Sequence, residues 1–394
     1  MSERPRGDPH ERVALTTIAA EWLRLGCTGF GGPPTHIALL RRLCVERRRW
    51  LGAQEFEDAI ATTSLLPGPA STQLAIFCAW RLRGAAGAFI GGLCFIGPGM
   101  VLILALAAVF LGTHPPLWIL GAATGAGAAV PSVALHAAWG LTPSSWRRSG
   151  RLRTQRSRWV VYALVGGAAA AIIGPFLVVV LVACGLVEVL IRLQGALPAG
   201  PRSVAAWLPV ALIHTVTLGG LGALAWVAFK VGALSYGGGF VIVPLMQHDA
   251  VTTYHWMTGA QFLDAVALGQ VTPGPVVLTV AVVGYAAAGV AGGLFTVLIA
   301  FTPSFVFVLA GGPRFDRIRG NALIQSFLIG AGPAVIGAIA GSTIPLGLAF
   351  HVVWQIPLLA SALLWLFVVR RGVVSALILA GLIGVVVVLA GASA

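Results

Sequence analysis

Long apolar stretches alternate with short polar connections along nearly the whole chain. A helix needs about 17 to 25 predominantly apolar residues to cross a bilayer, and ten stretches approach or exceed that length. Five are in the first half: Val13 to Phe30, Ala85 to Leu111, Leu117 to Trp139, Trp159 to Gly174 and Pro175 to Leu193. Five are in the second half: Trp207 to Ser235, Gly289 to Gly311, Ala322 to Ser342, Leu346 to Val369 and Val373 to Leu389. The pattern predicts an all-α polytopic membrane protein with about ten transmembrane helices.

Two further stretches, Asp58 to Trp80 and Asp264 to Ala286, contain Pro-Gly-Pro near their middle. Proline lacks a backbone N–H and clashes with the preceding turn, so a continuous helix is not expected there. Irregular backbone at membrane depth is tolerated where it is buried in protein or lines a cavity. We therefore interpret both stretches as broken or re-entrant helices.

The same constellation occurs twice. Phe30-Gly31-Gly32 and Pro67-Gly68-Pro69 recur as Tyr236-Gly237-Gly238 and Pro273-Gly274-Pro275, displaced by 206 positions in each case (236 − 30 and 273 − 67). Further pairs at this offset are Arg24 with Lys230, Trp50 with Trp256, Phe56 with Phe262, Asp58 with Asp264, Gly87 with Gly293 and Phe95 with Phe301. This pattern indicates an internal duplication with one constant register. We divide the chain into an N-terminal tail (1–12), a first repeat (13–193), a linker (194–206) and a second repeat (207–394).

The basic loops suggest how the repeats are oriented, because Lys and Arg favour the cytoplasmic side of a membrane. In the first half the loops Arg41 to Arg49 and Arg147 to Arg158 are densely basic. Their second-half equivalents, Gln247 to His255 and Thr343 to His351, contain no Lys or Arg. An odd number of spans per repeat would make the copies antiparallel. The sequence thus predicts two inverted five-span repeats, each with one Pro-Gly-Pro break.

Composition supports a membrane protein and argues against other classes. The chain is 58% hydrophobic and only 9% charged, against about 25% charged in soluble domains. The net charge of +13 comes from arginines spread over separate loops, so nucleic-acid binding is not expected. The five cysteines have no C-x-x-C spacing and are interpreted as packing residues.

The sequence contains no P-loop, H-E-x-x-H or G-x-S-x-G motif. An enzyme is therefore not expected, nor are a cofactor, a bound metal or catalytic residues. A membrane-embedded enzyme or a non-transporting scaffold remains the rival of another class.

The Gly-Gly breaks and the Pro-Gly-Pro turns have the features of an anion site. Interrupted helices expose amide donors and new helix N-termini, which attract negative charge. Thr72 and Gln73 follow the first turn, and Thr272 and Thr279 are part of the second. The alternatives are that these glycines serve close helix packing and that the hydroxyls bond back to the preceding turn.

Several ionisable residues have two interpretations. Lys230 is the only lysine of the chain and aligns with Arg24, so both are candidates for an intramembrane cation, or they reach the membrane interface. Asp58 and Asp264 are candidates for carrying protons, but stabilisation of a helix dipole in the first turn is favoured. His36 either titrates or is a satisfied hydrogen-bonding residue, which is the commoner case. Glu188 and Arg192, four residues apart, are expected to pair.

These motifs resemble those of the chromate ion transporter family, in its long-chain form with two homologous halves. The matching residues are Phe30-Gly31-Gly32-Pro33, Ile37-Ala38-Leu39, Glu46-Arg47-Arg48-Arg49-Trp50, Leu65-Leu66-Pro67-Gly68-Pro69 with Gln73, Tyr236-Gly237-Gly238 and Thr272-Pro273-Gly274-Pro275. The resemblance covers nearly the whole chain. Members associated with chromate resistance often have an acidic residue directly after the first Pro-Gly-Pro, where this chain has Ala70.

The resemblance implies secondary active export of chromate across the plasma membrane, with sulfate or another small anion as the alternative substrate. The expected partners are this oxyanion, a coupling proton or counter-anion, and the lipid bilayer; a homodimer is left open. The expected substrate-binding residues are Arg24, Phe30, Gly31, Gly32, Thr35, His36, Pro67, Gly68, Pro69, Thr72, Gln73, Lys230, Tyr236, Gly237, Gly238, Thr272, Pro273, Gly274 and Pro275.

Overall fold

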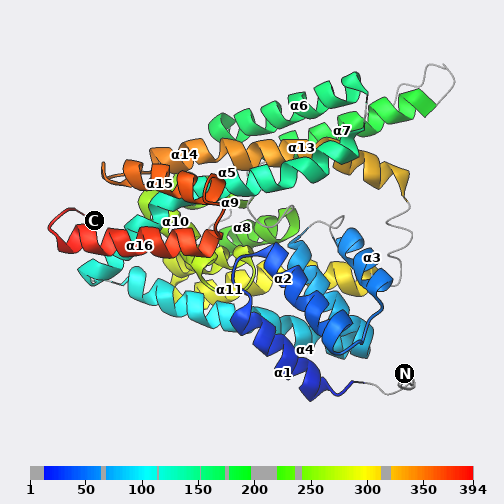
Figure 1. Ribbon diagram of the computed structural model, residues 1–394, viewed down its shortest axis with the longest axis horizontal. Coiled ribbons are helices and arrows are strands. Elements are labelled where there is room, and N and C mark those ends of the chain that lie inside the picture. The colour runs from blue at the N-terminus through cyan, green and yellow to red at the C-terminus, as the bar shows by residue number, and fades with distance from the viewer. Residues whose placement is uncertain are drawn as a thin grey trace.

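The computed structural model describes residues 13–63, 68–112, 115–150, 152–173, 177–196, 220–235, 242–311 and 321–393. These residues form helices and connecting turns, without a strand among them (Figure 1). The first-half elements are α1 (Leu15–Thr28), α2 (Pro33–Arg41), η1 (Arg42–Arg47), α3 (Ala53–Thr63), α4 (Ala70–Phe110), α5 (Leu117–Ser149), α6 (Arg153–Ala168), η2 (Ala169–Ile173) and α7 (Leu177–Ala196). The second-half elements are α8 (Gly220–Leu234), α9 (Ile242–Gln247), η5 (His248–Thr253), α10 (Gly259–Val271), η6 (Val276–Leu278), α11 (Thr279–Gly311), α13 (Ala322–Gly341), α14 (Thr343–Leu348), α15 (Gln355–Phe367) and α16 (Val373–Leu389).

Five helical stretches of the described chain are long and apolar enough to cross a membrane: α4, α5, Leu177–Gln194 of α7, η6 with α11, and α13 with α14. The helices α8, α15 and α16 are apolar but shorter. The fold is therefore that of an all-helical, polytopic membrane protein. The count of ten spans stays a prediction, because α1, α8, α15 and α16 are shorter than the roughly 20 residues that a full crossing takes.

One expected span is not continuous. The stretch Leu346 to Val369 is divided between the end of α14 and α15, with a turn between them. The Gln355 side chain stabilises this turn, since its Oε1 accepts hydrogen bonds from the backbone N–H groups of His351 (3.0 Å) and Val352 (3.3 Å). Apolar composition alone did not reveal the break, because the deciding group is a single buried amide.

Both Pro-Gly-Pro stretches are broken helices. The first consists of α3 and the beginning of α4, and the second of α10 and the beginning of α11. Each long helix then bends at a glycine of positive φ, Gly84 (59°) in α4 and Gly289 (63°) in α11. Because L-residues with a Cβ rarely adopt this conformation, glycine is needed at both bends. The segments before the bends, 70–83 and 276–288, are shorter than a spanning helix of about 20 residues.

The backbone geometry of the connection after α1 recurs after α8. The π-helices η1 and η5 are 206 positions apart, and each is followed by a residue of positive φ, Arg49 (54°) and His255 (52°). The next tryptophan then donates its backbone N–H into the π-helix over 2.8 Å, from Trp50 in one half and from Trp256 in the other. Both halves therefore contain the same local fold here.

The register between the halves changes by one residue after the second Pro-Gly-Pro turn. The bends at Gly84 and Gly289 are 205 positions apart (289 − 84), and the helix-interior prolines Pro98 and Pro303 have the same spacing (303 − 98). The second half has one residue fewer at this point. Its helix begins with the 3-10 turn η6, where α4 begins directly as an α-helix.

The expected pairings of Gly87 with Gly293 and of Phe95 with Phe301 are therefore wrong by one position. The structural equivalent of Gly87 is Gly292, because a Cβ on either glycine would collide with the carbonyl oxygen of the residue eight positions earlier. Both halves contain this close contact between a glycine and a carbonyl oxygen across the bend, and the contact identifies which residues correspond. The difference of one residue was hard to see in the sequence because the surrounding segment is uniformly apolar.

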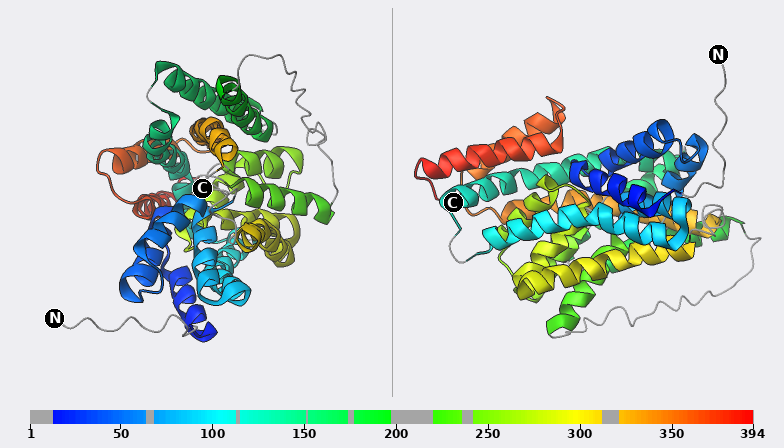
Figure 2. Two further views of the ribbon diagram at one scale, coloured as in Figure 1. Left: turned by 90° about the vertical axis from the view of Figure 1, so that its right-hand side faces the viewer. Right: turned by 90° about the horizontal axis from the view of Figure 1, so that it is seen from below.

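The two halves interlock. The first-half helix α5 packs against α10, α15 and α16, whereas the second-half helix α13 packs against α6 and α7 (Figure 1). The long helices α4 and α11 also pack against each other, as the view from below in Figure 2 shows. A cavity bounded by these helices necessarily has walls from both halves.

Small residues permit this close packing. Gly121 and Gly125 of α5 face backbone carbonyl groups of α16, and Gly337 and Gly341 of α13 face those of α6. A Cβ at any of the four positions would lie closer to those carbonyl oxygens than van der Waals contact allows. These glycine pairs therefore serve close packing between helices.

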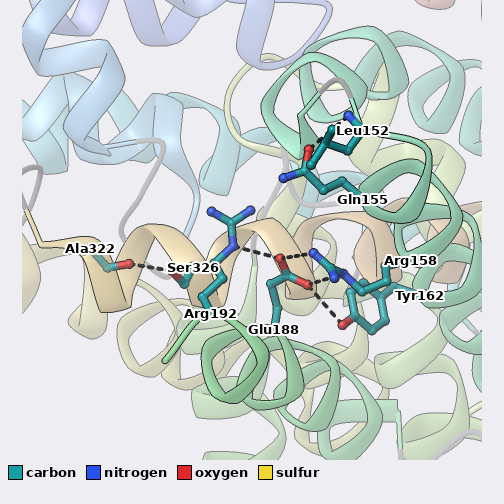
Figure 3. A network of polar contacts seen from close by, with 8 residues as sticks. All are labelled: Leu152, Gln155, Arg158, Tyr162, Glu188, Arg192, Ala322 and Ser326. Atoms are coloured by element: carbon teal, nitrogen blue, oxygen red, sulfur yellow. Dashed lines mark hydrogen bonds and ion pairs between the residues drawn. The ribbon is translucent and has the colours of Figure 1, made fainter. Parts of the chain in front are cut away.

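A buried charge cluster joins α6 to α7 (Figure 3). The expected Glu188–Arg192 pair is present at 2.8 Å. The Glu188 carboxylate also pairs with Arg158 at 3.1 Å and accepts a hydrogen bond from the Tyr162 hydroxyl at 3.2 Å. Because the Glu188 side chain is only 2% exposed, these partners offset its desolvation and tie the two helices together.

Candidate functional site

A cavity of about 540 Å³ lies where the first-half breaks meet helices of both halves. Its walls come from the beginnings of α2 and α4, from α5, and from the second-half helices α10, α13 and α16. The residues that line it are Gly31, Gly32, Pro33, Pro34, Ile37, Gly68, Ala70, Val133, His136, Ala137, Gly140, Leu141, Ser144, Ser145, Arg148, Gln270, Gly332, Val335, Ile336 and Val373.

The N-terminus of α2 forms part of the cavity wall. Gly31 (φ 97°) and Gly32 (φ 76°) have positive φ values, which end the preceding segment. Pro33 and Pro34 then occupy the first turn of α2, where proline is favoured because its missing N–H would have no helical partner. The partial positive charge of this helix end therefore lies beside the cavity.

The N-terminus of α4 lies at the same cavity. Gly68 (φ 116°) precedes Pro69, and α4 begins at Ala70. A side chain at position 68 would collide with the Gln73 amide, whose Nε2 lies 2.5 Å from the place of a Cβ. Glycine is thus required both for the backbone conformation and for the approach of Gln73. Two helix N-termini consequently contribute positive potential to one cavity.

Five polar side chains of the wall were not expected from the sequence: the serines Ser144 and Ser145, and Arg148, His136 and Gln270. Arg148 is in the last turn of α5 and is exposed, while His136 is half-buried on the same helix. Gln270 of α10 is 7% exposed, and its buried Nε2 has no hydrogen-bond partner among the described residues. These groups offer a guanidinium, an imidazole and an amide donor to a ligand in the cavity.

His36 has a structural role. It is 1% exposed, and its Nε2 lies 2.9 Å from the Gly29 carbonyl oxygen while its Nδ1 lies 3.2 Å from the Ser71 hydroxyl. Both ring nitrogens are therefore satisfied, and the imidazole joins the end of α1 to the beginning of α4. Of the two interpretations of His36, the structure supports the satisfied hydrogen-bonding residue.

The second Pro-Gly-Pro turn packs against the first-half break. The Gly274 N–H donates a hydrogen bond to the Gly29 carbonyl oxygen over 2.9 Å. The Thr272 hydroxyl donates back to the Leu268 carbonyl at 2.9 Å, which is the back-bonded alternative. Neither this turn nor its prolines Pro273 and Pro275 line the cavity. The cavity is therefore asymmetric, formed chiefly around the first turn.

Other expected substrate-binding residues lie beside the cavity without lining it. Thr72 and Gln73 are fully buried, and the Thr72 hydroxyl has no hydrogen-bond partner in the described parts of the chain. Phe30 is 42% exposed, and the Thr35 hydroxyl lies 3.0 Å from where a Cβ of Gly31 would be. The expected residues Pro67, Tyr236, Gly237 and Gly238 lie outside the described residues, as do the tail 1–12 and positions 197–206 of the expected linker, whose first three residues belong to α7.

The two expected cations are not brought together. Lys230 pairs with Asp249 at 2.6 Å, and both side chains are largely buried. Arg24 lines a separate hollow between α1 and α2. Neither residue lines the large cavity. Arg24 and Lys230 therefore do not share a binding site, although they occupy equal positions in the two repeats.

Asp58 and Asp264 do not stabilise a first helical turn, so that favoured interpretation is wrong. Each is the sixth residue of its helix, α3 or α10. Asp58 accepts a hydrogen bond from Gln54 at 3.3 Å and is half-buried. Asp264 is 5% exposed, and its Oδ1 has no hydrogen-bond partner among the described residues. Both helices begin five residues before the aspartate (58 − 53 and 264 − 259), so neither side chain lies in a first turn.

Long apolar helices, two broken helices and a cavity with walls from both halves together describe a multi-pass membrane protein. The family model for chromate transporters matches residues 16–189 and 222–386. The chain therefore belongs to the chromate transporter family, as the motif resemblance predicted.

Relatives with this description are similar over most of their length. The chromate transport protein of Cupriavidus metallidurans is 32% identical over 84% of this chain and 82% of its own. The chromate transport protein of Pseudomonas aeruginosa is 31% identical over 85% and 81%, respectively. A probable chromate transport protein of Synechococcus elongatus is 28% identical over 86% of both chains. No solved structure matches the chain.

Proposed function

We propose that this protein exports chromate across the plasma membrane by secondary active transport, with the cavity as its binding site. Membership of the chromate transporter family supports the substrate. The observation that carries the proposal is that two helix N-termini, a guanidinium and the buried Gln270 amide, whose Nε2 has no hydrogen-bond partner among the described residues, converge on one cavity. Positive potential and hydrogen-bond donors are what a tetrahedral oxyanion requires.

In this proposal Gly31, Gly32 and Gly68 let the backbone approach the anion, while Arg148 and Gln270 contact it. The site keeps the Gly-Gly break and the first Pro-Gly-Pro turn that the sequence singled out. It leaves out Arg24 and Lys230, because their side chains lie elsewhere.

Alternating access would follow from the interlocked halves. First-half elements α2, α4 and α5 form one side of the cavity, and second-half elements α10 and α13 form the other. Rocking of an inverted pair of repeats would open this interface first toward one side of the membrane and then toward the other.

Chromate uptake into everted membrane vesicles tests the site, since uptake there corresponds to export from the cell. The Arg148→Gln variant should raise the KM for chromate at least tenfold, because a hydrogen bond to a charged group contributes roughly 1.5–3 kcal/mol and about 1.4 kcal/mol equals a factor of ten. Gln270→Leu should act in the same direction. Arg147→Gln, which changes the neighbouring arginine that does not line the cavity, is the matched control.

Equal transport by Arg148→Gln, Gln270→Leu and Arg147→Gln would refute this binding site. Competition with sulfate in the same vesicles tests the substrate. Chromate uptake that a large excess of sulfate suppresses would identify a general oxyanion transporter.

Asp264 is our candidate for coupling transport to protons. Its carboxyl group is buried in α10, two turns before the break, and a Cβ on Gly127 of α5 would lie only 2.5 Å from its Oδ1. An isolated carboxylate is costly in such surroundings, so binding of a proton relieves the desolvation penalty.

The test of coupling is the Asp264→Asn variant, which resembles the protonated group in shape. We expect it to bind chromate but to lose the stimulation of uptake by an imposed pH gradient. Asp58→Asn is the control at the aligned, half-buried position. Unchanged stimulation in Asp264→Asn would exclude this residue as the proton carrier.

A further inference from the structure

A second hollow, of about 310 Å³, lies between α1 and the helical segment formed by α2 and η1. It shares no residue with the large cavity. Its lining residues are Glu21, Arg24, Leu25, Thr28, Leu39, Arg42, Leu43 and Arg47. Three arginines and a single carboxylate thus surround a space large enough for a small polyatomic anion.

The carboxylate is already committed to other partners. Glu21 Oε1 accepts hydrogen bonds from Arg47 (2.5 Å) and Arg48 (2.5 Å). Arg24 and Arg42, in contrast, have no ion pair among the described residues. The hollow therefore contains positive charge that is not neutralised by an ion pair within the described part of the chain.

In the equivalent region of the second half, the cation has a carboxylate partner. At the offset of 206 established for this region, Arg24 corresponds to Lys230, Arg42 to His248 and Leu43 to Asp249. Lys230 pairs with Asp249 at 2.6 Å. The first half has leucine where this aspartate stands, so its cation lacks the counter-charge that its equivalent has.

We propose that an external tetrahedral oxyanion group supplies the missing counter-charge in this hollow, held by Arg24 and Arg42 with Arg47 at its edge. Guanidinium groups present paired donors that match the oxygens of such a group. The group is either a free oxyanion or the phosphate of a lipid headgroup. This second anion site is independent of the transport site proposed above.

Thermal unfolding of the purified, delipidated protein in detergent tests the site, because a ligand of the folded state raises the unfolding temperature. One arm titrates inorganic phosphate at constant ionic strength, with chloride as the reference. The other compares phosphatidic acid with diacylglycerol, which differ in the phosphate group. We expect wild type to be stabilised by at least one phosphate probe beyond its reference.

Two variants remove the site in different ways. Arg24→Gln deletes one cation, and Leu43→Asp installs the counter-charge of the second half. Each should raise the apparent Kd for the effective probe about tenfold or more, whereas Arg153→Gln, an exposed arginine on α6, should not. Arg24→Gln carries the test if Leu43→Asp does not fold.

The result also identifies the source of the anion. Stabilisation by inorganic phosphate indicates a free oxyanion, and stabilisation by phosphatidic acid alone indicates a lipid headgroup. If neither probe stabilises wild type, or if Arg24→Gln responds to both as wild type does, the proposal is wrong. Chromate transport by Arg148→Gln is a separate readout, so failure of one site is distinguishable from failure of the other.

Discussion

The Lys230–Asp249 pair combines two charges in a setting that water reaches poorly, with side-chain exposures of 16% and 8%. Desolvation of such a pair nearly cancels its Coulomb attraction, so its net contribution to stability is small. Removing one partner is different, because it leaves the other charge buried and uncompensated.

We therefore expect Asp249→Asn to lower the free energy of unfolding by about 3–5 kcal/mol. The double variant Lys230→Met with Asp249→Leu should recover most of this loss, since it removes both charges and introduces the leucine found at position 43 in the first half. Thermal unfolding in detergent measures both. A double variant as unstable as Asp249→Asn would show that the pair itself, and not the uncompensated charge, determines the effect.

Among elements, the bend of α4 separates its short first part from its long apolar part. Gly84 has a φ of 59°, and a Cβ there would meet no atom within 4 Å. The requirement for glycine is thus conformational and not steric. Gly97, farther along the same helix, has equally open space without a positive φ, which makes it a matched control.

Gly84→Ala should destabilise the protein by about 1–2 kcal/mol, the approximate cost of a left-handed conformation for an L-residue. Gly97→Ala should be neutral or stabilising by up to about 1 kcal/mol, because alanine is the better helix former. Unfolding temperatures of the two purified variants give the comparison. Equal temperatures would mean that α4 straightens without penalty.

The contact between α6 and α13 depends on glycines that leave no room for a side chain. Gly337→Ala should cost about 1–3 kcal/mol, because its Cβ would overlap an α6 carbonyl and force the helices apart. Gly347→Ala in α14, where a Cβ would meet nothing within 4 Å, is the control. Comparable stability of the two variants would show that the helix contact readjusts freely.

For the whole molecule, the decisive property is the orientation of the repeats. Inverted repeats place the connection before α6 and the connection before α15 on opposite sides of the membrane, with the basic first-half connection in the cytoplasm. Ser157, in the second turn of α6, and His351, in the turn before α15, are exposed positions close to these two connections.

In a background with all five cysteines replaced by alanine, a membrane-impermeant maleimide should label Ser157→Cys only in everted vesicles. It should label His351→Cys only in right-side-out vesicles. Labelling of both variants from the same side would rule out the inverted arrangement.

Much of the helical architecture was predictable because apolar length and helix-breaking residues act locally. The bounds of α16 and the break between α3 and α4 follow from composition and from Gly-Pro chemistry alone. The split between α14 and α15 was not predictable, since it depends on one glutamine side chain that satisfies backbone amides. The one-residue register change was hidden for a similar reason, because only packing against a neighbouring carbonyl distinguishes Gly292 from Gly293.

By itself, the sequence determined the family, the membrane character and the glycine and proline residues that end the helices, because these depend on residue type and local spacing. The tertiary structure decided which of those breaks borders the cavity. It placed Arg148 of the first half and Gln270 of the second on one wall, although 122 positions separate them (270 − 148). It also gave Lys230 an internal partner, whereas Arg24 has no ion pair within the described segments. Both outcomes depend on distances between segments remote in the chain, which no local pattern encodes.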